Sequence, residues 1–296
     1  MDQKLQIDKN IQYIIDKYDD FIFDIWGVLH SGDFKFFTGI LELFKEIKLK
    51  GKKSHILSNA PHIATVLISK FNSFGFSQEL YSSFTTSGQF FFESISSSEK
   101  NKNYFIISTD RDILSVSKIK NIANYTDKIE DATDIIITNL NDQNQDQQRD
   151  FIKKEILPIA KKNNCILHCL NPDRFVIYFD GSKSICPGII ASDYQEIGGI
   201  VKHYGKPKSE IYEFIFNKYS INRKKSIMIG DTVETDIFGA SNVLISSILV
   251  LTGNYAYSNL YQFNKDIWLE KSKQLLSKED QNSQPEFILD NLQLSS

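Results

Sequence analysis

The stretch Phe21-Ile-Phe-Asp24-Ile-Trp26-Gly27-Val-Leu-His30 decides the fold, together with Gly230-Asp231-Thr-Val-Glu-Thr235-Asp236 about 200 residues later. In each, an apolar run (21–23 and 227–229) leads into an aspartate. Such runs are typical of buried parallel strands, whose carboxyl ends meet at one edge of an open α/β sheet. We therefore expect Asp24 and Asp231 to lie close together. A pair of carboxylates placed in this way would bind a divalent cation, most naturally Mg²⁺.

The composition is that of a soluble globular protein, with 41% hydrophobic and 24% charged residues among 296. A net charge of −3 argues against nucleic acid or an anionic membrane as a partner. No apolar run reaches the ~18 residues of a membrane span, and the polar N-terminal residues do not resemble a signal peptide. Cys165, Cys169 and Cys186 lack the spacing of a zinc site or a disulfide framework. These features together predict a cytoplasmic location.

Apolar runs alternate with helical patterns along most of the chain, which predicts an α/β fold with a doubly wound, Rossmann-like parallel sheet. The expected strands are 21–25, 54–57, 80–86, 104–107, 134–138, 166–170, 201–204, 227–229 and 247–251. The expected helices follow Thr38 (as N-cap), Pro61 and Ser87, and cover 149–163, 189–197, 210–219 and the residues after Thr235. Weaker patterns suggest a hairpin over 175–186, a helix over 265–277 and an edge strand over 286–290.

The polar motifs at positions 24, 58, 206 and 231 all directly follow expected strands. The block 87–183 contains none of them, although it alternates strands and helices in the same way. We therefore predict a core domain formed by 1–86 and 184–296, with 87–183 inserted as a smaller α/β cap domain over these motifs.

Each polar motif has an ordinary structural explanation when taken alone, such as a helix cap for Ser58-Asn59 or a surface position for Lys206. Their order is what is specific. It runs strand-Asp24, strand-Ser58-Asn59, insertion, strand-Lys206-Pro207, and strand-Gly230-Asp231 through Asp236.

With this order of motifs, the sequence resembles the haloacid dehalogenase-like hydrolase superfamily over roughly residues 20 to 255. More closely, it resembles class IIA, whose cap is inserted between the second and third motifs, and which contains p-nitrophenylphosphatase-like and sugar- or pyridoxal-phosphate phosphatases. Further signatures are Thr86-Ser87-Gly88, Asn171-Pro172-Asp173, Tyr204-Gly205-Lys206-Pro207 and Leu251-Thr252-Gly253.

The resemblance implies a role for each motif residue. Asp24 would attack phosphorus and form an aspartyl-phosphate. Ser58 and Asn59 would donate hydrogen bonds to phosphoryl oxygens at a helix start, and Lys206 would neutralise negative charge. Mg²⁺ would be bound by Asp24, Asp231 and the backbone carbonyl of Trp26. Asp236 would orient a coordinated water or anchor Lys206.

Trp26 departs from the family pattern, and resembles a branch whose first motif is Asp-x-Trp-Gly. Phosphatases of the family usually carry an aspartate here, whose general acid–base help is worth ~10²–10⁴-fold in rate. An indole cannot supply it. Either the enzyme acts on good leaving groups, or another donor such as His30 or His62 replaces the aspartate. His55, inside an expected strand, is interpreted as structural.

The function expected from these residues is Mg²⁺-dependent hydrolysis of a small phosphorylated metabolite. The alternative is a catalytically weak protein that binds phosphate or a metabolite on the same scaffold, which Trp26 favours. Retention of Asp24, Lys206 and Asp231 favours the enzyme. A homodimer through the cap is considered as an assembly.

Overall fold

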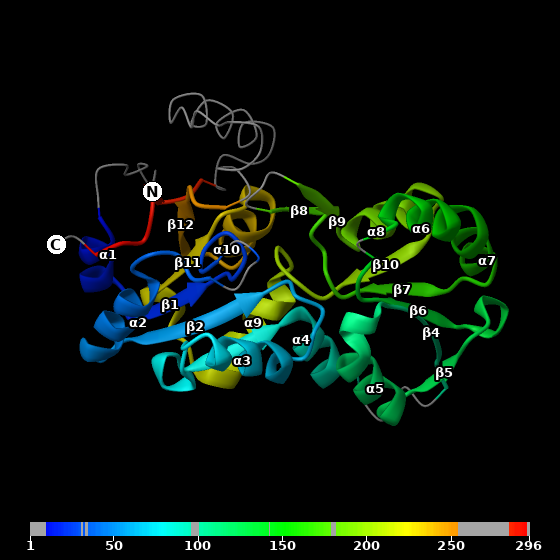
Figure 1. Cartoon of the computed structure of the whole chain (residues 1–296), viewed down its shortest axis with the longest axis horizontal. Helices are drawn as coiled ribbons and strands as arrows, with labels where there is room; N and C mark the ends of the chain where they lie inside the picture. Colours follow the sequence, from blue (N-terminus) through cyan, green and yellow to red (C-terminus); the bar gives the residue numbers. More distant parts are fainter. Residues whose placement is uncertain are drawn as a thin grey trace.

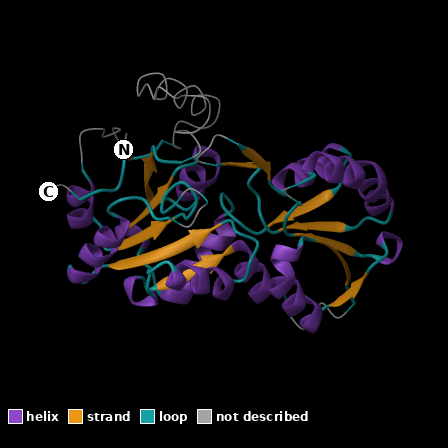
Figure 2. Ribbon diagram, in the orientation of Figure 1, coloured by secondary structure: helices purple, strands orange, loops and turns teal. Residues whose placement is uncertain are grey.

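The computed structural model describes residues 10–30, 32, 35–95, 101–141, 143–178, 182–253 and 284–294. Within them, two sheets of parallel strands form the centres of two α/β units, which lie side by side as Figures 1 and 2 show. No helix in these ranges is both long and apolar enough to cross a bilayer. The expected helix over 265–277 lies outside the described residues.

The first unit is built on a six-stranded sheet in the order β13-β12-β11-β1-β2-β3, and each adjacent pair is parallel. Its strands are β1 Asp20–Phe23, β2 Lys53–Ser58, β3 Ser83–Thr86, β11 Ser226–Gly230, β12 Ser246–Val250 and β13 Phe287–Leu289. The doubly wound parallel sheet expected from the sequence is confirmed, and β13 is the expected edge strand.

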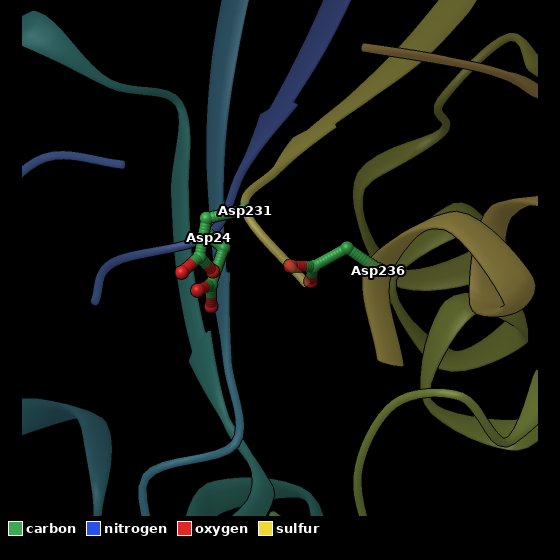
Figure 3. Close-up of side chains that lie close together, drawn as sticks. All are labelled: Asp24, Asp231 and Asp236. Atoms are coloured by element: carbon green, nitrogen blue, oxygen red, sulfur yellow. The ribbon is translucent and has the colours of Figure 1, made fainter. Parts of the chain in front are cut away.

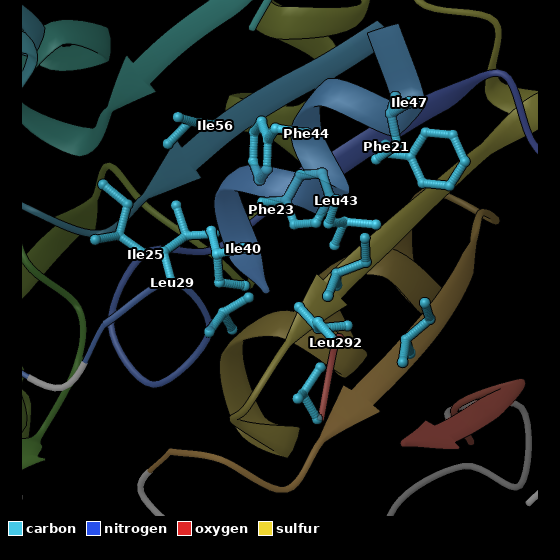
Figure 4. Close-up of a cluster of buried hydrophobic side chains, with 14 of the residues drawn as sticks. Phe21, Phe23, Ile25, Leu29, Ile40, Leu43, Phe44, Ile47, Ile56 and Leu292 are labelled. Carbon is cyan, nitrogen blue, oxygen red and sulfur yellow. The ribbon is translucent and has the colours of Figure 1, made fainter. Parts of the chain in front are cut away.

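Alternate residues of each strand bury opposite faces of this sheet, because strand side chains have a period of two. Phe21 and Phe23 point into a cluster with helices α1, α2 and α3, shown in part in Figure 4. Ile22 between them points into a second cluster with helices α9 and α10 on the opposite face. The helices of this unit are α1 Ile11–Lys17, α2 Ile40–Leu49, α3 Ala64–Ser73, α4 Ser87–Ser94, α9 Ser209–Tyr219 and α10 Phe238–Asn242. Gly39, and not the expected Thr38, is the N-cap of α2.

The second unit is built on a five-stranded parallel sheet in the order β10-β7-β6-β4-β5. Its strands are β4 Asn103–Ile107, β5 Asn124–Thr126, β6 Asp134–Ile137, β7 Ile166–Cys169 and β10 Ile200–His203. Figure 1 shows α6, α7 and α8 on one side of this sheet and α5 on the other. These helices are α5 Ile113–Ile122, α6 Gln145–Phe151, α7 Leu157–Lys162 and α8 Gly188–Glu196. The hairpin expected over 175–186 is present as β8 Phe175–Ile177 antiparallel to β9 Lys183–Ile185.

The second unit reaches further along the chain than the expected cap boundary at residue 183. Strand β10 pairs with β7, and α8 packs Ile190 and Tyr194 into the core of this unit. Strand periodicity cannot indicate which of two sheets a strand will join, so the sequence placed both elements in the first unit. We therefore propose the division 1–86 plus 204–296 for the core and 87–203 for the cap.

Candidate active site

Three buried carboxylates meet at the carboxyl edge of the six-stranded sheet (Figure 3). Asp24 follows β1 and Asp231 follows β11, and these strands are neighbours. The Asp24 backbone N–H continues the ladder by donating to the carbonyl of Ile229 over 2.9 Å. Asp236 comes from the π-helical turn Val233–Ile237 that follows. One carboxylate oxygen from each of the three lies within 4.8 Å of the others.

Two glycines allow the loops to close around Asp231. A Cβ at Gly27 would lie 2.3 Å from Asp231 Oδ2, and one at Gly253 would lie 1.9 Å from the same oxygen. Gly27 also has φ of +78°, which other residues rarely adopt. The hydroxyl of Thr252 donates to the Gly27 carbonyl over 2.6 Å and ties the two loops together. The carboxylate of Asp231 is therefore enclosed by backbone.

Lys206 is buried between two of the aspartates. Its Nζ lies 2.5 Å from Asp24 Oδ1 and 2.6 Å from Asp236 Oδ1. Burial alone would lower the pKa of Lys206, but Asp236 and Asp24 raise it above its ordinary value, so the side chain stays protonated. Burial raises the pKa of Asp24 above its ordinary value although Lys206 opposes this. The family resemblance implied that Lys206 would neutralise negative charge, and here its ammonium group lies between two carboxylates.

The donor set fits a hard divalent cation. Three carboxyl groups and one ammonium group make up this set of buried side chains, so acidic groups outnumber basic ones within it. Carboxylate oxygens are the ligands that Mg²⁺ prefers, usually one or two from protein with several waters. Asp236 is already engaged, because Oδ1 accepts from Lys206 and Oδ2 accepts from the Thr232 backbone N–H over 3.2 Å. This pattern suits Asp236 to anchoring Lys206, and leaves Asp24 and Asp231 as the better-placed metal ligands.

Ser58 ends β2 at the same edge and Asn59 follows it, but the hydrogen bonds of Asn59 differ from those expected from the sequence. Its Nδ2 donates to Asp173 Oδ1 over 2.8 Å and to the Lys206 carbonyl over 3.1 Å. Its Oδ1 accepts from the Lys206 backbone N–H over 2.7 Å. A phosphoryl contact from this amide would require one of these bonds to break. The helix α3 begins only at Ala64, so neither residue lies at the helix start on which the expectation relied.

A cavity of about 250 Å³ lies between the two units, beside Ser58 at the end of β2. The core contributes Trp26 and Ser58 to its wall, and the cap contributes Arg111, Asp173 and Tyr178. Trp26 also connects the units directly. Its Nε1–H donates to the Ile177 carbonyl over 3.2 Å, and its ring meets Tyr178 edge-on at 5.2 Å between centroids. The indole at position 26 therefore docks the β8 strand of the cap onto the core.

The loop Asn171-Pro172-Asp173 brings one further carboxyl group to this cavity. Burial raises the pKa of Asp173 to about 6, against the hydrogen bond from Asn59 and the charge of Lys206, both of which lower it. The sequence singled out this tripeptide as a family signature without assigning Asp173 a role. Only the packing of the cap against the core reveals its neighbours.

The histidines considered as proton donors have other surroundings. His30 Nδ1 accepts from the Gly32 backbone N–H over 3.0 Å, and its ring packs edge-on against Phe71 at 5.9 Å. His62 Nδ1 lies 3.2 Å from Asp112 Oδ1, and burial lowers the pKa of His62. His55 is buried in β2 with its ring nitrogens beside Ser83 and Asp20, in agreement with a structural role.

Sequence comparisons find two family models in this chain. One, described as haloacid dehalogenase-like hydrolase, matches residues 21–120, and a related hydrolase model matches residues 203–293. A 4-nitrophenylphosphatase of Schizosaccharomyces pombe is 27% identical over 278 residues, which cover 86% of this chain and 90% of that protein. The chloroplastic phosphoglycolate phosphatase 1A of Arabidopsis thaliana is 23% identical and covers 85% of this chain and 74% of its own length.

Solved structures with the same fold cover nearly the whole chain. A haloacid dehalogenase-like hydrolase from Brucella suis superposes with a TM-score of 0.78 at 21% identity, covering 97% of this chain and all of that one. A 4-nitrophenylphosphatase from Thermotoga maritima gives a TM-score of 0.68 at 20% identity, covering 94% of this chain and 96% of that one. The architecture of two α/β units is therefore shared with these proteins.

Proposed function

Because the chain belongs to the haloacid dehalogenase-like hydrolases, we propose that it is a Mg²⁺-dependent phosphatase of a small phosphorylated metabolite, acting through an aspartyl-phosphate. The single observation that carries this proposal is the buried group of Asp24, Lys206 and Asp231, whose sequence neighbours Ile25 and Trp26 line the cavity between core and cap. The similarity in sequence to phosphatases of class IIA supports the same conclusion.

Asp24, Asp231 and the backbone carbonyl of Trp26 would hold Mg²⁺, which when bound would neutralise charge on the phosphoryl oxygens. Asp24 would use its second oxygen as the nucleophile toward phosphorus. Lys206 would hold Asp24 in position and stabilise the negative charge that develops in the transition state. Asp236, which accepts a hydrogen bond from Lys206, keeps that ammonium group aimed at the reacting centre. Ser58 would donate to a phosphoryl oxygen.

The cavity supports a small substrate. Its volume of about 250 Å³ lies below the ~300–1,000 Å³ that is typical of ligand pockets. The relatives named above are phosphatases of 4-nitrophenyl phosphate and of phosphoglycolate, which are both compact monoesters. We propose a substrate of similar size.

The test is phosphate release from a panel of phosphorylated metabolites, with and without Mg²⁺, for wild type and Asp24→Asn. We expect release that needs both Mg²⁺ and Asp24. The second candidate function is a binding protein with little turnover, and the specific observation in its favour is Trp26. Tight binding of a phosphorylated metabolite without any release, in the presence of Mg²⁺, would support that function and refute the phosphatase.

A further inference from the structure

The indole of Trp26 is committed to holding the cap. It donates to the Ile177 carbonyl and packs against Tyr178, so it acts as a contact between units. An indole N–H is a donor without acid–base chemistry near neutral pH. A phosphatase that forms an aspartyl-phosphate still has to protonate a basic leaving oxygen. The proton must therefore come from another group that lines the same cavity.

Asp173 is the one carboxylic acid among the described residues that line this cavity. It follows β7, and the structure fixes its loop on several sides. Its backbone N–H donates to Asn171 Oδ1 over 3.1 Å, and its carbonyl accepts from the Gly188 N–H over 3.0 Å. A Cβ at Gly188 would lie 2.5 Å from that carbonyl, so the loop and α8 are in close contact. The side chain is held by Asn59, whose amide also holds Lys206.

The charges around Asp173 favour a carboxyl group that exchanges protons near neutral pH. Burial is the largest cause that raises its pKa, and the negative charges of Asp236 and Glu234 act in the same direction. The Asn59 hydrogen bond and Lys206 lower it, and the balance of these effects is a pKa of about 6. Asp173 is also near enough to Asp24 for its charge to raise the pKa of that residue. A group poised in this way is suited to general acid–base catalysis at the pH of most cells.

Resting on the function proposed above, we propose that Asp173 of the cap donates the proton to the leaving oxygen, in the place of the missing acid at position 26. As Asp24 bonds to phosphorus, the bond from phosphorus to the leaving oxygen breaks, and the Asp173 proton moves to that oxygen to give the alcohol. The Asp173 carboxylate then takes a proton from the water that attacks the aspartyl-phosphate. Inorganic phosphate leaves, Asp24 is regenerated, and Asp173 is protonated again.

The two histidines considered from the sequence fit this role less well. His30 already uses Nδ1 as an acceptor for Gly32, and aromatic rings surround it. Burial and the charges of Lys70 and Arg111 lower the pKa of His62, so that it carries little proton to donate at neutral pH. The packing of the cap against the core thus includes a docking contact, through Trp26, and places the proposed acid, Asp173, in the cavity.

The test compares two substrates of similar size that differ in how strongly the leaving oxygen needs a proton. These are 4-nitrophenyl phosphate, whose leaving group departs without one, and benzyl phosphate, which leaves as a basic alkoxide. We expect Asp173→Asn to lower kcat for benzyl phosphate by ~10²-fold or more and to change kcat for 4-nitrophenyl phosphate much less. Asp173→Glu should restore part of the lost rate, because it restores an acid. His62→Gln serves as the competing variant.

The outcomes separate this inference from the proposed function. An equal loss for both substrates in Asp173→Asn would mean that Asp173 only supports the loop, and would overturn the inference. The inference would also be overturned if His62→Gln lowered kcat for benzyl phosphate alone while Asp173→Asn left kcat for both substrates unchanged. If wild type with Mg²⁺ releases phosphate from neither substrate and from no member of the metabolite panel, the proposed function fails and the inference fails with it. Thermal unfolding of each variant checks that the chain is folded.

Discussion

Replacing Lys206 with methionine should destabilise the core sharply, because it removes the ammonium group that lies between Asp24 and Asp236. The lysine is 1% exposed and contacts both carboxylates at 2.5 and 2.6 Å. Removal of one partner from a buried ion pair typically costs about 3–5 kcal/mol, since a charge is left buried without compensation. We expect a loss in this range at pH 8 in the absence of divalent cations.

The loss should depend on pH in a defined direction. Lys206 opposes the rise that burial gives to the pKa of Asp24, so without Lys206 this pKa should rise further above its value in the unfolded chain. The folded variant then binds more protons than the unfolded chain, so its stability rises as the pH falls. The stability difference between wild type and Lys206→Met should therefore be smaller at pH 5.5 than at pH 8.

Urea unfolding of both proteins at the two pH values, in a chelator, measures this difference. The double variant Lys206→Met with Asp236→Asn is the matched control, because it removes one of the two orphaned charges and should recover part of the loss. A difference below about 1 kcal/mol at pH 8, or one that does not change with pH, would refute the idea that a buried charge imbalance governs this site.

Three further predictions follow from other contacts. Asp231→Asn should abolish Mg²⁺ binding in calorimetry, and equal affinity in both proteins would remove Asp231 from the metal site. Gly27→Ala should also weaken Mg²⁺ binding at least ~10-fold, since its Cβ would lie 2.3 Å from Asp231 Oδ2. Unchanged affinity would mean that the loop at Gly27 shifts without displacing Asp231. Asp193→Asn should destabilise the cap by about 1.5–3 kcal/mol, because buried Asp193 accepts from Arg149 and Lys153. Burial would raise the pKa of Asp193, but those hydrogen bonds lower it overall. Its contribution to stability is therefore present above pH ~4 and declines as the pH falls below that value; a deficit in urea unfolding that does not shrink between pH 5 and pH 2.5 would contradict this.

The sequence predicted the parts of the site that local patterns determine. A strand that ends in a carboxylate has one expected position at a sheet edge, so Asp24 and Asp231 could be placed together before any coordinates were known. The role of Lys206 was expected only from the resemblance to the haloacid dehalogenase-like hydrolases, because a lysine before a proline is otherwise a surface position.

The remaining features depend on contacts between segments that no local pattern encodes. The place of β10 in the second sheet depends on its pairing with β7, at the edge of that sheet. Asn59 and Asp173 are joined by a hydrogen bond that spans the two units. The sequence shows only that Trp26 stands where related phosphatases carry an acid. The structure adds that its indole N–H donates a hydrogen bond to the backbone of the cap.

The strand order of the core has a consequence for how the chain is made. The central strand β1 pairs with β2 on one side and with β11 on the other, and Asp20 meets Ser226 across that second pairing. A ribosome completes every strand of the five-stranded sheet before it adds residue 226. The insert can therefore fold as a unit during synthesis, since domains generally do so, while one edge of β1 waits unpaired. The nascent chain must keep that apolar edge from pairing with other chains until β11 emerges.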